Sequence, residues 1–412
     1  MSAWTHAAVC AALGIGTTAV ADDLAYTGVS TDTRALQPGQ LFVALAGERF
    51  DAHDYLAAAA DAGATGAVVH RMPDDAPATL TYYVVDDTLH ALGRLGRCHR
   101  RRMGWTLVAV AGANGKTTTK DLLRAALSAK YRVHATTGNL NNLIGAPLTL
   151  LSAPDDAEVV VSEIGTNVPG EVAQLAAIVE PDVAIITSIA AEHLEGLGDL
   201  DGVLREETSV LPWLPARGMV AVPDEPASLA ERARALAPRV VVVGTSDAAA
   251  GAYRAHDVTL GEAGDVRFGW QGRTVRLQLR GRHNARNALL ALAIAEELGV
   301  DADAAVTRLA ELAPAKMRGE FHRIGGLTII ADCYNANPAS VTAAVDLLVS
   351  LPRGGGRVAV LGTMKELGVE SARLHADAAA EVAASDVDLI VATGEFADAF
   401  AAHAEGLGER LI

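Results

Sequence analysis

Cysteine is scarce in this sequence, and no two cysteines lie close together. The three are Cys10, Cys98 and Cys333 in a chain of 412 residues. Such widely separated residues offer no disulfide framework and no pair at metal-ligand spacing. This usage is typical of proteins in a reducing compartment, so the expected location is the cytoplasm. We interpret all three as ordinary core residues.

Positive charge is also in short supply. The chain has 34 Lys and Arg against 50 Asp and Glu, a formal net charge of −16. A general nucleic-acid or membrane-surface role would need a basic field, so both are disfavoured. Phosphate groups must then be bound locally, by a loop and a metal ion. The length indicates two to four globular domains.

A basic leader followed by a long apolar run is missing as well. Residues 7–21 are apolar and rich in small side chains, but Thr17 and Thr18 interrupt them. The segment is too short to span a membrane and lacks the charge of a signal peptide. We expect an amphipathic helix there and no membrane insertion.

The most informative stretch is T-L-V-A-V-A-G-A-N-G-K-T-T-T, residues 106–119. It indicates a buried strand ending at Gly112, a turn, and a helix that opens at Lys116. Glycines let the turn point its N–H groups inward, and the helix N-terminus adds partial positive charge. Lys116 can reach the outer phosphates and Thr117 can hold Mg²⁺. The predicted nucleotide-binding residues are Gly112, Ala113, Asn114, Gly115, Lys116, Thr117 and Thr118.

This loop departs from the usual phosphate-loop pattern, because Val110 stands where a further glycine is expected. It is a shorter variant, and the alternative is an ordinary strand-turn-helix with a chance Gly-Lys-Thr. A second apolar strand, residues 158–162, delivers Glu163 at its end. A carboxylate at the carboxyl end of a strand beside a phosphate loop can hold or orient Mg²⁺. The alternative for Glu163 is a surface glutamate.

Further motifs accompany the loop along the chain. They are V-S-T-D-T-R-A-L-Q-P-G from residue 29, G-N-L-N-N-L-I-G-A-P-L-T-L from 138, A-A-E-H-L-E-G-L-G from 190, G-R-H-N-A-R-N-A from 281 and D-C-Y-N-A-N-P-A-S from 332. Together with A-G-A-N-G-K-T-T-T, they resemble the Mur ligase family, the ATP-dependent ligases that build the peptide stem of bacterial peptidoglycan. The resemblance spans nearly the whole chain.

This resemblance implies an α/β fold of three domains. A small N-terminal α/β domain, residues 1–88, would bind the UDP substrate. A central domain, residues 89–313, would bind ATP on a P-loop ATPase-like parallel sheet, with a β-rich insertion at 253–279. A Rossmann-like C-terminal domain would begin at residue 314, with strands at 327–331 and 387–392. Because the chain stops at Ile412, we expect this last domain to be truncated.

The resemblance also implies an activity. D-alanyl-D-alanine would be joined to a UDP-N-acetylmuramoyl tripeptide through an acyl phosphate, by a monomer that uses ATP and Mg²⁺. The D-C-Y-N-A-N-P-A-S element is specific to the family member with this acceptor. Two alternatives remain open: an amide ligase of the same fold acting on a natural-product carboxylate, and a catalytically weak nucleotide-binding regulatory protein.

Site residues follow from the same resemblance. Contacts to the UDP-sugar would come from Ser30, Thr31, Asp32 and Arg34. The peptide substrates would meet Asn139, Asn142, Tyr334, Asn335 and Asn337. The nucleotide would meet Asn284 and Asn287 at the adenine, Arg318 at the phosphates, and Asp332. Mg²⁺ would be held by Thr117, Glu163, His193 and Glu207. The catalytic set would be Lys116, Glu163, His193, Glu207 and Arg318.

Glu207 marks a departure from the family pattern. The family normally has a carbamylated lysine about a dozen residues after His193, but no lysine lies between Lys130 and Lys316. Alignment places Glu207 at that position. The resemblance places His193 and this position at a second metal ion, so either Glu207 supplies the carboxylate directly or that metal site is altered. The competing interpretations are that Glu207 is an exposed helical glutamate, or that Glu206 is the ligand.

Overall fold

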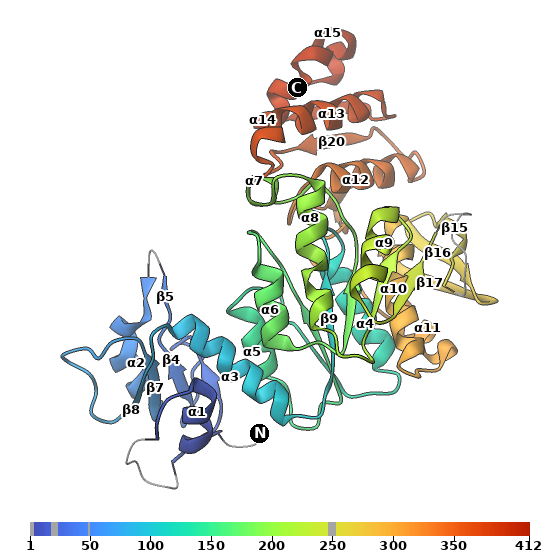
Figure 1. Ribbon diagram of the computed structural model, residues 1–412. Helices are drawn as coiled ribbons and strands as arrows, with labels where there is room; N and C mark the ends of the chain where they lie inside the picture. The colour runs from blue at the N-terminus through green and yellow to red at the C-terminus, as the bar shows by residue number, and fades with distance from the viewer. Residues whose placement is uncertain (1–3, 18–23, 48–49, 246–252) are drawn as a thin grey trace. The chain divides into compact units, whose positions relative to one another are not determined.

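The computed structural model describes residues 4–17, 24–47, 50–245 and 253–412 (Figure 1). Contacts divide the chain into two compact units. The first comprises residues 1–109, 132–164 and 174–181, and the second comprises residues 110–131, 165–173 and 182–412. Within the described ranges, no helix combines the length and the apolar composition that a membrane crossing requires.

A four-stranded parallel sheet organises the N-terminal part of the first unit, in the order β3-β4-β7-β8. Its strands are β3 Val29–Ser30, β4 Leu41–Val43, β7 Gly66–Val69 and β8 Thr81–Val84. Successive side chains of a strand point to opposite faces. Leu41 and Val43 therefore enter one buried cluster, while Phe42 enters another. Both faces of β4 and β7 are buried, which is why these two strands carry apolar side chains on both faces.

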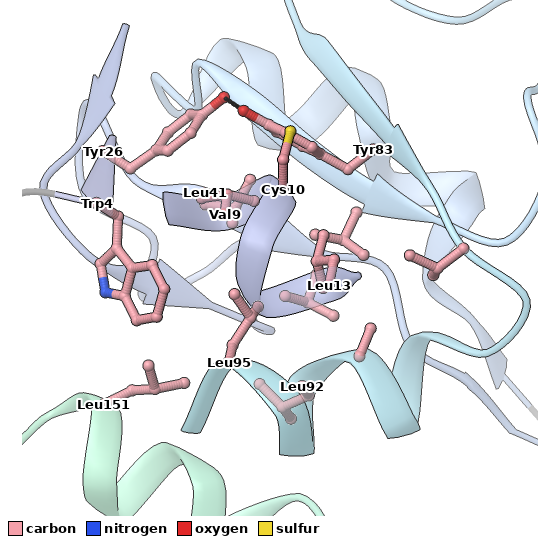
Figure 2. Close-up of a cluster of buried hydrophobic side chains, with 14 residues drawn as sticks. Trp4, Val9, Cys10, Leu13, Tyr26, Leu41, Tyr83, Leu92, Leu95 and Leu151 are labelled. Carbon is pink, nitrogen blue, oxygen red and sulfur yellow. Dashed lines mark hydrogen bonds between the residues drawn. The ribbon is translucent and has the colours of Figure 1, made fainter. Parts of the chain in front are cut away.

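Helices and short strand pairs complete this part of the unit. They are α1 His6–Leu13, α2 Leu56–Asp61, α3 Thr88–Arg102, β1 Trp4–Thr5, β2 Ala25–Tyr26, β5 Ala46–Gly47 and β6 Phe50–Asp51. Figure 2 shows how Leu13 of α1 and Leu92 of α3 meet in one apolar cluster. At its edge the hydroxyls of Tyr26 and Tyr83 are hydrogen-bonded at 2.8 Å, so the polar ends of these buried rings are satisfied.

The opening helix is shorter than the sequence predicts. We expected a helix over residues 7–21, but α1 ends at Leu13, and Gly14 follows with φ of +69°. A glycine in this left-handed conformation is a common helix terminator. The prediction is therefore wrong for residues 14–17, and residues 18–21 lie outside the described part of the chain.

Six strands form one sheet, in the order β10-β11-β9-β12-β13-β14. Its strands are β9 Thr106–Ala111, β10 Val133–Ala135, β11 Val159–Glu163, β12 Val183–Ile186, β13 Met219–Pro223 and β14 Val240–Val243. The pairs β10–β11, β12–β13 and β13–β14 are parallel. The boundary between the two contact units passes through β9. The predicted α/β class with parallel sheets is confirmed.

Helices follow these strands along the chain. They are α4 Lys116–Leu127, α5 Gly145–Leu151, α6 Glu171–Val179, α7 Leu194–Leu197, α8 Leu200–Glu207, α9 Ala227–Leu236, α10 His283–Glu297 and α11 Ala302–Ala310. The β-rich insertion is an antiparallel sheet of β15 His256–Leu260, β16 Asp265–Trp270 and β17 Arg273–Arg280. Buried and exposed residues alternate along β17, as the alternating sequence predicts.

The C-terminal part contains two separate strand pairs. Antiparallel β18 Glu320–Ile324 and β19 Leu327–Ala331 are joined by Gly325 and Gly326, both with positive φ. Such glycine pairs suit tight hairpin turns. Parallel β20 Val358–Leu361 and β21 Leu389–Ala392 form the other pair. The strand predicted at 327–331 is present, but it pairs with β18, which the sequence analysis did not predict.

The remaining helices pack on β20 and β21. They are α12 Pro338–Ser350, α13 Ser371–Ala384, α14 Glu395–Ala399 and α15 Ala404–Leu407. Val345, Leu361, Ile390 and Phe396 meet in a single buried cluster. Strand-helix alternation around parallel strands is the pattern that the sequence predicts for this region.

Candidate active site

The turn between β9 and α4 is fixed by two glycines. Gly112 has φ of +115° and Gly115 has φ of +85°, which side chains other than glycine rarely adopt. A Cβ atom on Gly112 would lie 2.3 Å from Thr187 Oγ1, and one on Gly115 would lie 2.8 Å from Asn287 Oδ1. Both glycines are therefore required by conformation and by close packing, as a loop that approaches phosphate needs.

Ser188, just beyond β12, braces this phosphate loop. Its carbonyl accepts from the Ala113 N–H at 2.9 Å, and its hydroxyl accepts from the Asn114 N–H at 2.7 Å. The same hydroxyl donates to the Asn114 carbonyl at 3.0 Å. These bonds hold the loop tip against the sheet, so the loop's shape precedes any ligand. The N-terminus of α4 adds the partial positive charge of the helix dipole.

Lys116 lies at the start of α4 with its ammonium folded over the loop. Its Nζ donates to the carbonyl of Gly112 at 2.5 Å and to that of Ala113 at 3.0 Å. The Glu192 carboxylate lies 3.4 Å from Nζ, and both side chains are largely buried. The sequence analysis missed Glu192, although the position just after the carboxyl end of β12 could have indicated it.

Glu207 lies at the base of the same loop. It is 1% exposed, and its Oε2 accepts from the Gly112 N–H at 2.6 Å. Burial raises the pKa of Glu207 to about 7, while the positive charge of Lys116 acts in the opposite direction and Glu192 adds to the rise. Glu207 is therefore not an exposed helical glutamate: it brings a carboxylate directly to the phosphate loop.

Its neighbour Glu206 has a different task. The Glu206 carboxylate accepts from the Thr166 hydroxyl at 3.2 Å, from the Gly170 N–H at 2.7 Å and from the Val172 N–H at 2.8 Å. These three hydrogen bonds hold residues 166–172, the segment that leads into the start of α6, in place. Because both of its carboxylate oxygens already accept these hydrogen bonds, Glu206 is a weaker candidate for a metal ligand than Glu207.

His193 follows β12 in the left-handed conformation, with φ of +52°. Its Nδ1 contacts the Oε2 of Glu366 in the turn after β20, and the His193 side chain is 15% exposed. The imidazole is thus held in one orientation. The sequence analysis did not assign a role to Glu366, which lies 173 residues away along the chain.

Glu163 ends β11 as predicted and is 2% exposed. Its Oε1 accepts from the Asn141 Nδ2 at 2.9 Å. Asn141 was not among the predicted substrate residues, which were its neighbours Asn139 and Asn142. The Oδ1 of Asn142 instead accepts from the N–H groups of residues 144 and 145, at 3.1 and 2.9 Å. Asn142 shapes the entry to α5, and Asn139 is exposed.

Asn284 and Asn287 lie in the first turns of α10 and are buried. The Asn287 Nδ2 donates to the Asn284 Oδ1 at 3.0 Å, and the Asn284 Nδ2 donates to the Arg280 carbonyl at 2.7 Å. Neither residue is the N-cap of α10, which is Arg282. The close approach of Asn287 to Gly115 places this pair beside the phosphate loop.

Residues from the C-terminal part approach the same loop. The Arg318 Nη2 lies 3.5 Å from the Thr117 Oγ1, and its guanidinium stacks on the Tyr334 ring, 4.4 Å from the centroid. Asp332 Oδ1 accepts from the N–H of residue 319 at 3.2 Å. Asn335 is exposed, and its Oδ1 accepts from the N–H of the next residue at 3.0 Å.

Asn337 makes a reciprocal pair with the phosphate loop. Its Nδ2 donates to the Asn114 Oδ1 at 2.9 Å, and the Asn114 Nδ2 donates to its Oδ1 at 3.1 Å. Asn337 is 2% exposed and also caps α12, with its Oδ1 accepting from the Ser340 N–H. The D-C-Y-N-A-N-P element is therefore tied directly to the loop.

The predicted UDP-sugar residues form a self-contained turn in the first unit. Asp32 pairs with Arg34 through a two-pronged contact, at 2.9 and 2.7 Å. Arg34 holds the pKa of Asp32 down to about 2. The Ser30 hydroxyl accepts from the Asp32 N–H at 3.2 Å, and Thr31 lies between them, half-buried. The turn keeps its charges at the surface, where a substrate can reach them.

The residues predicted to bind Mg²⁺ provide suitable donors. Thr117, His193 and Glu207 belong to the second unit, and Glu163 belongs to the first. Hydroxyl and carboxylate oxygens are the ligands that Mg²⁺ prefers. The buried carboxylate of Glu207 beside Lys116 fits a site where a cation balances phosphate charge, so the residues of the second unit fit the ion.

A second group of possible metal ligands is explained by local bonding. Asp51, His53 and His70 bring ligand atoms within 4.8 Å of one another. However, His53 Nδ1 bonds the Asp51 carboxylate at 2.6 Å, and His53 Nε2 accepts from the His70 N–H at 3.1 Å. Arg71 pairs with the other Asp51 oxygen. Both ring nitrogens of His53 are occupied, so the group is structural.

Known proteins resemble this chain along its whole length. Three family models match: the Mur ligase family catalytic domain at residues 25–100, the Mur ligase middle domain at 110–295, and the Mur ligase glutamate ligase domain at 317–411. The UDP-N-acetylmuramoyl-tripeptide–D-alanyl-D-alanine ligase of Bacillus subtilis (strain 168) is 36% identical over 372 residues, 89% of this chain and 80% of that protein.

Solved structures agree with the sequence matches. The crystal structure of MurF from Acinetobacter baumannii superposes with a TM-score of 0.88 at 32% identity, covering 100% of this chain and 89% of that one. The crystal structure of MurF ligase from Thermotoga maritima in complex with ADP superposes with a TM-score of 0.79 at 26% identity. The match covers 90% of this chain and 85% of that one. The matched segments give the chain a three-domain α/β architecture.

Proposed function

Because this chain belongs to the Mur ligase family, we propose that it joins D-alanyl-D-alanine to a UDP-N-acetylmuramoyl tripeptide during peptidoglycan precursor synthesis. ATP is converted to ADP and phosphate in the reaction. The observation that carries this proposal is the reciprocal pair between Asn337 and Asn114. It joins the element that is specific for the D-alanyl-D-alanine acceptor to the loop that receives ATP.

The chemistry proceeds in two steps. An oxygen of the tripeptide's terminal carboxylate takes the γ-phosphoryl group of ATP, which gives an acyl phosphate and ADP. The unprotonated amine of D-alanyl-D-alanine then attacks the carbonyl carbon, the C–N bond forms, and the C–O bond to phosphate breaks. The departing phosphate keeps one oxygen of the original carboxylate. This activation is needed because a carboxylate alone does not react with an amine.

Positive groups and the loop stabilise the charge on the transferring phosphoryl group. The loop N–H groups and Lys116 act at the outer phosphates, after Lys116 leaves the carbonyls of residues 112 and 113. Arg318 approaches from the C-terminal part, beside Thr117. Asn284 and Asn287 support the loop and adjoin the adenosine end, and Asp332 contacts the nucleotide. Exclusion of water by domain closure protects the acyl phosphate from hydrolysis.

Mg²⁺ would neutralise phosphate charge and orient the reacting oxygens. Thr117, Glu163, His193 and Glu207 would hold it. Glu207 would replace the family's carbamylated lysine with a carboxylate on a shorter stem, so a shift of the backbone or of the ion, or a bridging water, would make up the difference in length. Asn141 orients Glu163 through the 2.9 Å bond to its Oε1.

The domains divide the remaining work. Residues 1–88 bind the UDP-sugar through Ser30, Thr31, Asp32 and Arg34. Residues 89–313 bind ATP, and residues 314–412 form a Rossmann-like domain that brings the acceptor to Tyr334, Asn335 and Asn337. Asn139 and Asn142 lie in the loop that grips the peptide. The enzyme acts in the cytoplasm, where its nucleotide substrates are made. It acts as a monomer.

An assay of acceptor preference tests this function. The full chain is incubated with ATP, Mg²⁺ and UDP-N-acetylmuramoyl tripeptide, and phosphate release is measured with D-alanyl-D-alanine, D-alanine, glutamate or a diamino acid. D-Alanyl-D-alanine should be preferred at least about tenfold, because a site that recognises a dipeptide gains binding energy from both of its residues. Faster ligation of glutamate or a diamino acid would overturn the assignment of the acceptor.

The same assay separates the two alternatives. Phosphate release that requires a different carboxylate in place of the UDP-linked tripeptide would identify an amide ligase acting outside the cell wall. ATP binding without phosphate release in the presence of any of these substrates would identify a regulatory protein. Either result contradicts the proposed function.

A further inference from the structure

The turn after β20 docks against the turn that carries His193. The turn is M-K-E-L-G, residues 364–368. The Glu366 carbonyl accepts from the Glu195 N–H at 3.0 Å. A Cβ atom on Gly368 would lie 3.0 Å from the Glu195 Cα, so the close approach requires glycine there. Backbone bonding and backbone proximity therefore fix how the two turns meet.

Side-chain packing supports the same contact. Leu194, Leu197 and Val203 form a buried cluster, and Leu374 of α13 packs against it. On the other side, Met364 is 1% exposed, and its N–H donates to the His375 Nε2 at 2.9 Å. The docked turn is thus anchored at its start as well as at its tip.

Within this contact the Glu366 carboxylate meets the His193 ring. Its Oε2 accepts from His193 Nδ1, and Glu366 reaches this position with φ of +64°. A neutral imidazole that donates from Nδ1 carries its lone pair on Nε2. The carboxylate therefore selects the tautomer that is protonated on Nδ1 and leaves the lone pair of Nε2 available to bind a cation.

We propose that Glu366 is a positioning residue that orients His193 for a divalent cation and makes cation affinity depend on docking of the 364–368 turn. This rests on the proposed function only in taking His193 as a metal ligand. A carboxylate behind a metal-binding histidine fixes the ring and raises the basicity of its donor nitrogen. By thermodynamic reciprocity, the bound cation stabilises the docked turn by the same factor.

Direct Mn²⁺ binding tests this proposal without turnover. Free Mn²⁺ is measured by electron paramagnetic resonance in the presence of ADP, for the wild type, Glu366→Gln, Glu366→Ala and the control Glu195→Gln. Glu195 is an exposed neighbour in the turn that carries His193, so its substitution removes the same charge from the other side of the same contact. Glu366→Ala should weaken Mn²⁺ binding by about 10- to 100-fold, as expected for the loss of such a partner, and Glu195→Gln should change it by less than about twofold.

The tautomer of His193 provides a readout that a purely structural role would not move. Nitrogen-15 shifts of the ring should show Nδ1 protonated in the wild type and a shift toward the Nε2-protonated form in Glu366→Ala. Unchanged Mn²⁺ binding and an unchanged tautomer in a folded Glu366→Ala would overturn the proposal, and tighter Mn²⁺ binding would show that Glu366 competes with the cation. Because neither measurement needs an acceptor, these outcomes are independent of the acceptor assay.

Discussion

The phosphate loop and the Ser30–Arg34 turn are both assigned to phosphate-bearing groups, but they are built differently. The loop is formed by backbone, with glycines that no other residue can replace and with Lys116 only 14% exposed. The turn is formed by side chains, and Arg34 is 87% exposed and paired with Asp32. The phosphate loop is therefore fixed by backbone geometry and close packing, whereas the Ser30–Arg34 turn consists of exposed and half-buried side chains.

This difference determines what each site can contribute. A charge in a partly buried, preorganised loop acts through a low effective dielectric, where loss of one cation affects the transition state strongly. An exposed ion pair is screened by water and salt and contributes at most about 1 kcal/mol to stability. We therefore expect the loop to govern turnover and the turn to govern substrate affinity.

The largest effect should come from Lys116→Ala. No other lysine of the loop can replace its charge at the outer phosphates, so turnover should fall at least about 10²-fold. Phosphate release measures the loss, and the thermal unfolding temperature should stay close to that of the wild type. Lys130→Ala, just beyond the other end of the same helix, serves as the matched control and should retain turnover. Wild-type phosphate release in Lys116→Ala would refute the assignment of the loop.

A smaller effect is expected from Glu207→Gln. Its carboxylate is held at the loop by the Gly112 N–H, so removing the charge should raise the Mg²⁺ concentration for half-maximal turnover by at least about tenfold. A Mg²⁺ titration of phosphate release measures this. Stripping bicarbonate at low pH and restoring it should leave wild-type activity unchanged, because Glu207 needs no carbamylation.

Glu206→Gln is the matched control for this experiment. The Glu206 carboxylate accepts three hydrogen bonds from residues 166–172, and the substitution weakens these bonds. The free energy of unfolding should therefore fall by about 1–3 kcal/mol. Its Mg²⁺ dependence should remain that of the wild type. If Glu207→Gln also keeps wild-type Mg²⁺ dependence, Glu207 does not replace the carbamylated lysine.

The smallest of these effects is expected in the exposed turn. Arg34→Ala should raise the KM for the UDP-linked tripeptide about tenfold, as expected for loss of one charged hydrogen bond, with kcat nearly unchanged. Steady-state kinetics separate the two constants. Arg71→Ala is the control, since Arg71 also pairs with an aspartate at the surface of the N-terminal part. A fall in kcat at constant KM would place Arg34 in the chemical step instead.

Local sequence predicted the sites that depend on local geometry. The start of α4 at Lys116, the position of Glu163 at the end of β11 and the glycine turn between β9 and α4 are all as expected. Each follows from residues within one strand-turn-helix, where glycine conformation and strand length leave few choices.

Contacts between distant residues had no such signal. Three asparagines in G-N-L-N-N offer the same chemistry, and the turn alone decides that Asn141 faces Glu163. Glu366 meets His193 only because two turns far apart in sequence dock together. The β18–β19 hairpin was missed for a related reason: Gly325-Gly326 permits the turn, but the pairing partner of β19 depends on the tertiary fold.

Oxygen transfer from substrate to phosphate tests most directly the central claim that this loop activates a carboxylate by phosphorylation. The UDP-linked tripeptide is labelled with ¹⁸O in its terminal carboxylate, and the phosphate released with D-alanyl-D-alanine is analysed by mass spectrometry. The account predicts that each phosphate carries one ¹⁸O atom, because the C–O bond of the acyl phosphate breaks. Unlabelled phosphate, formed at the same rate as the amide product, would contradict it.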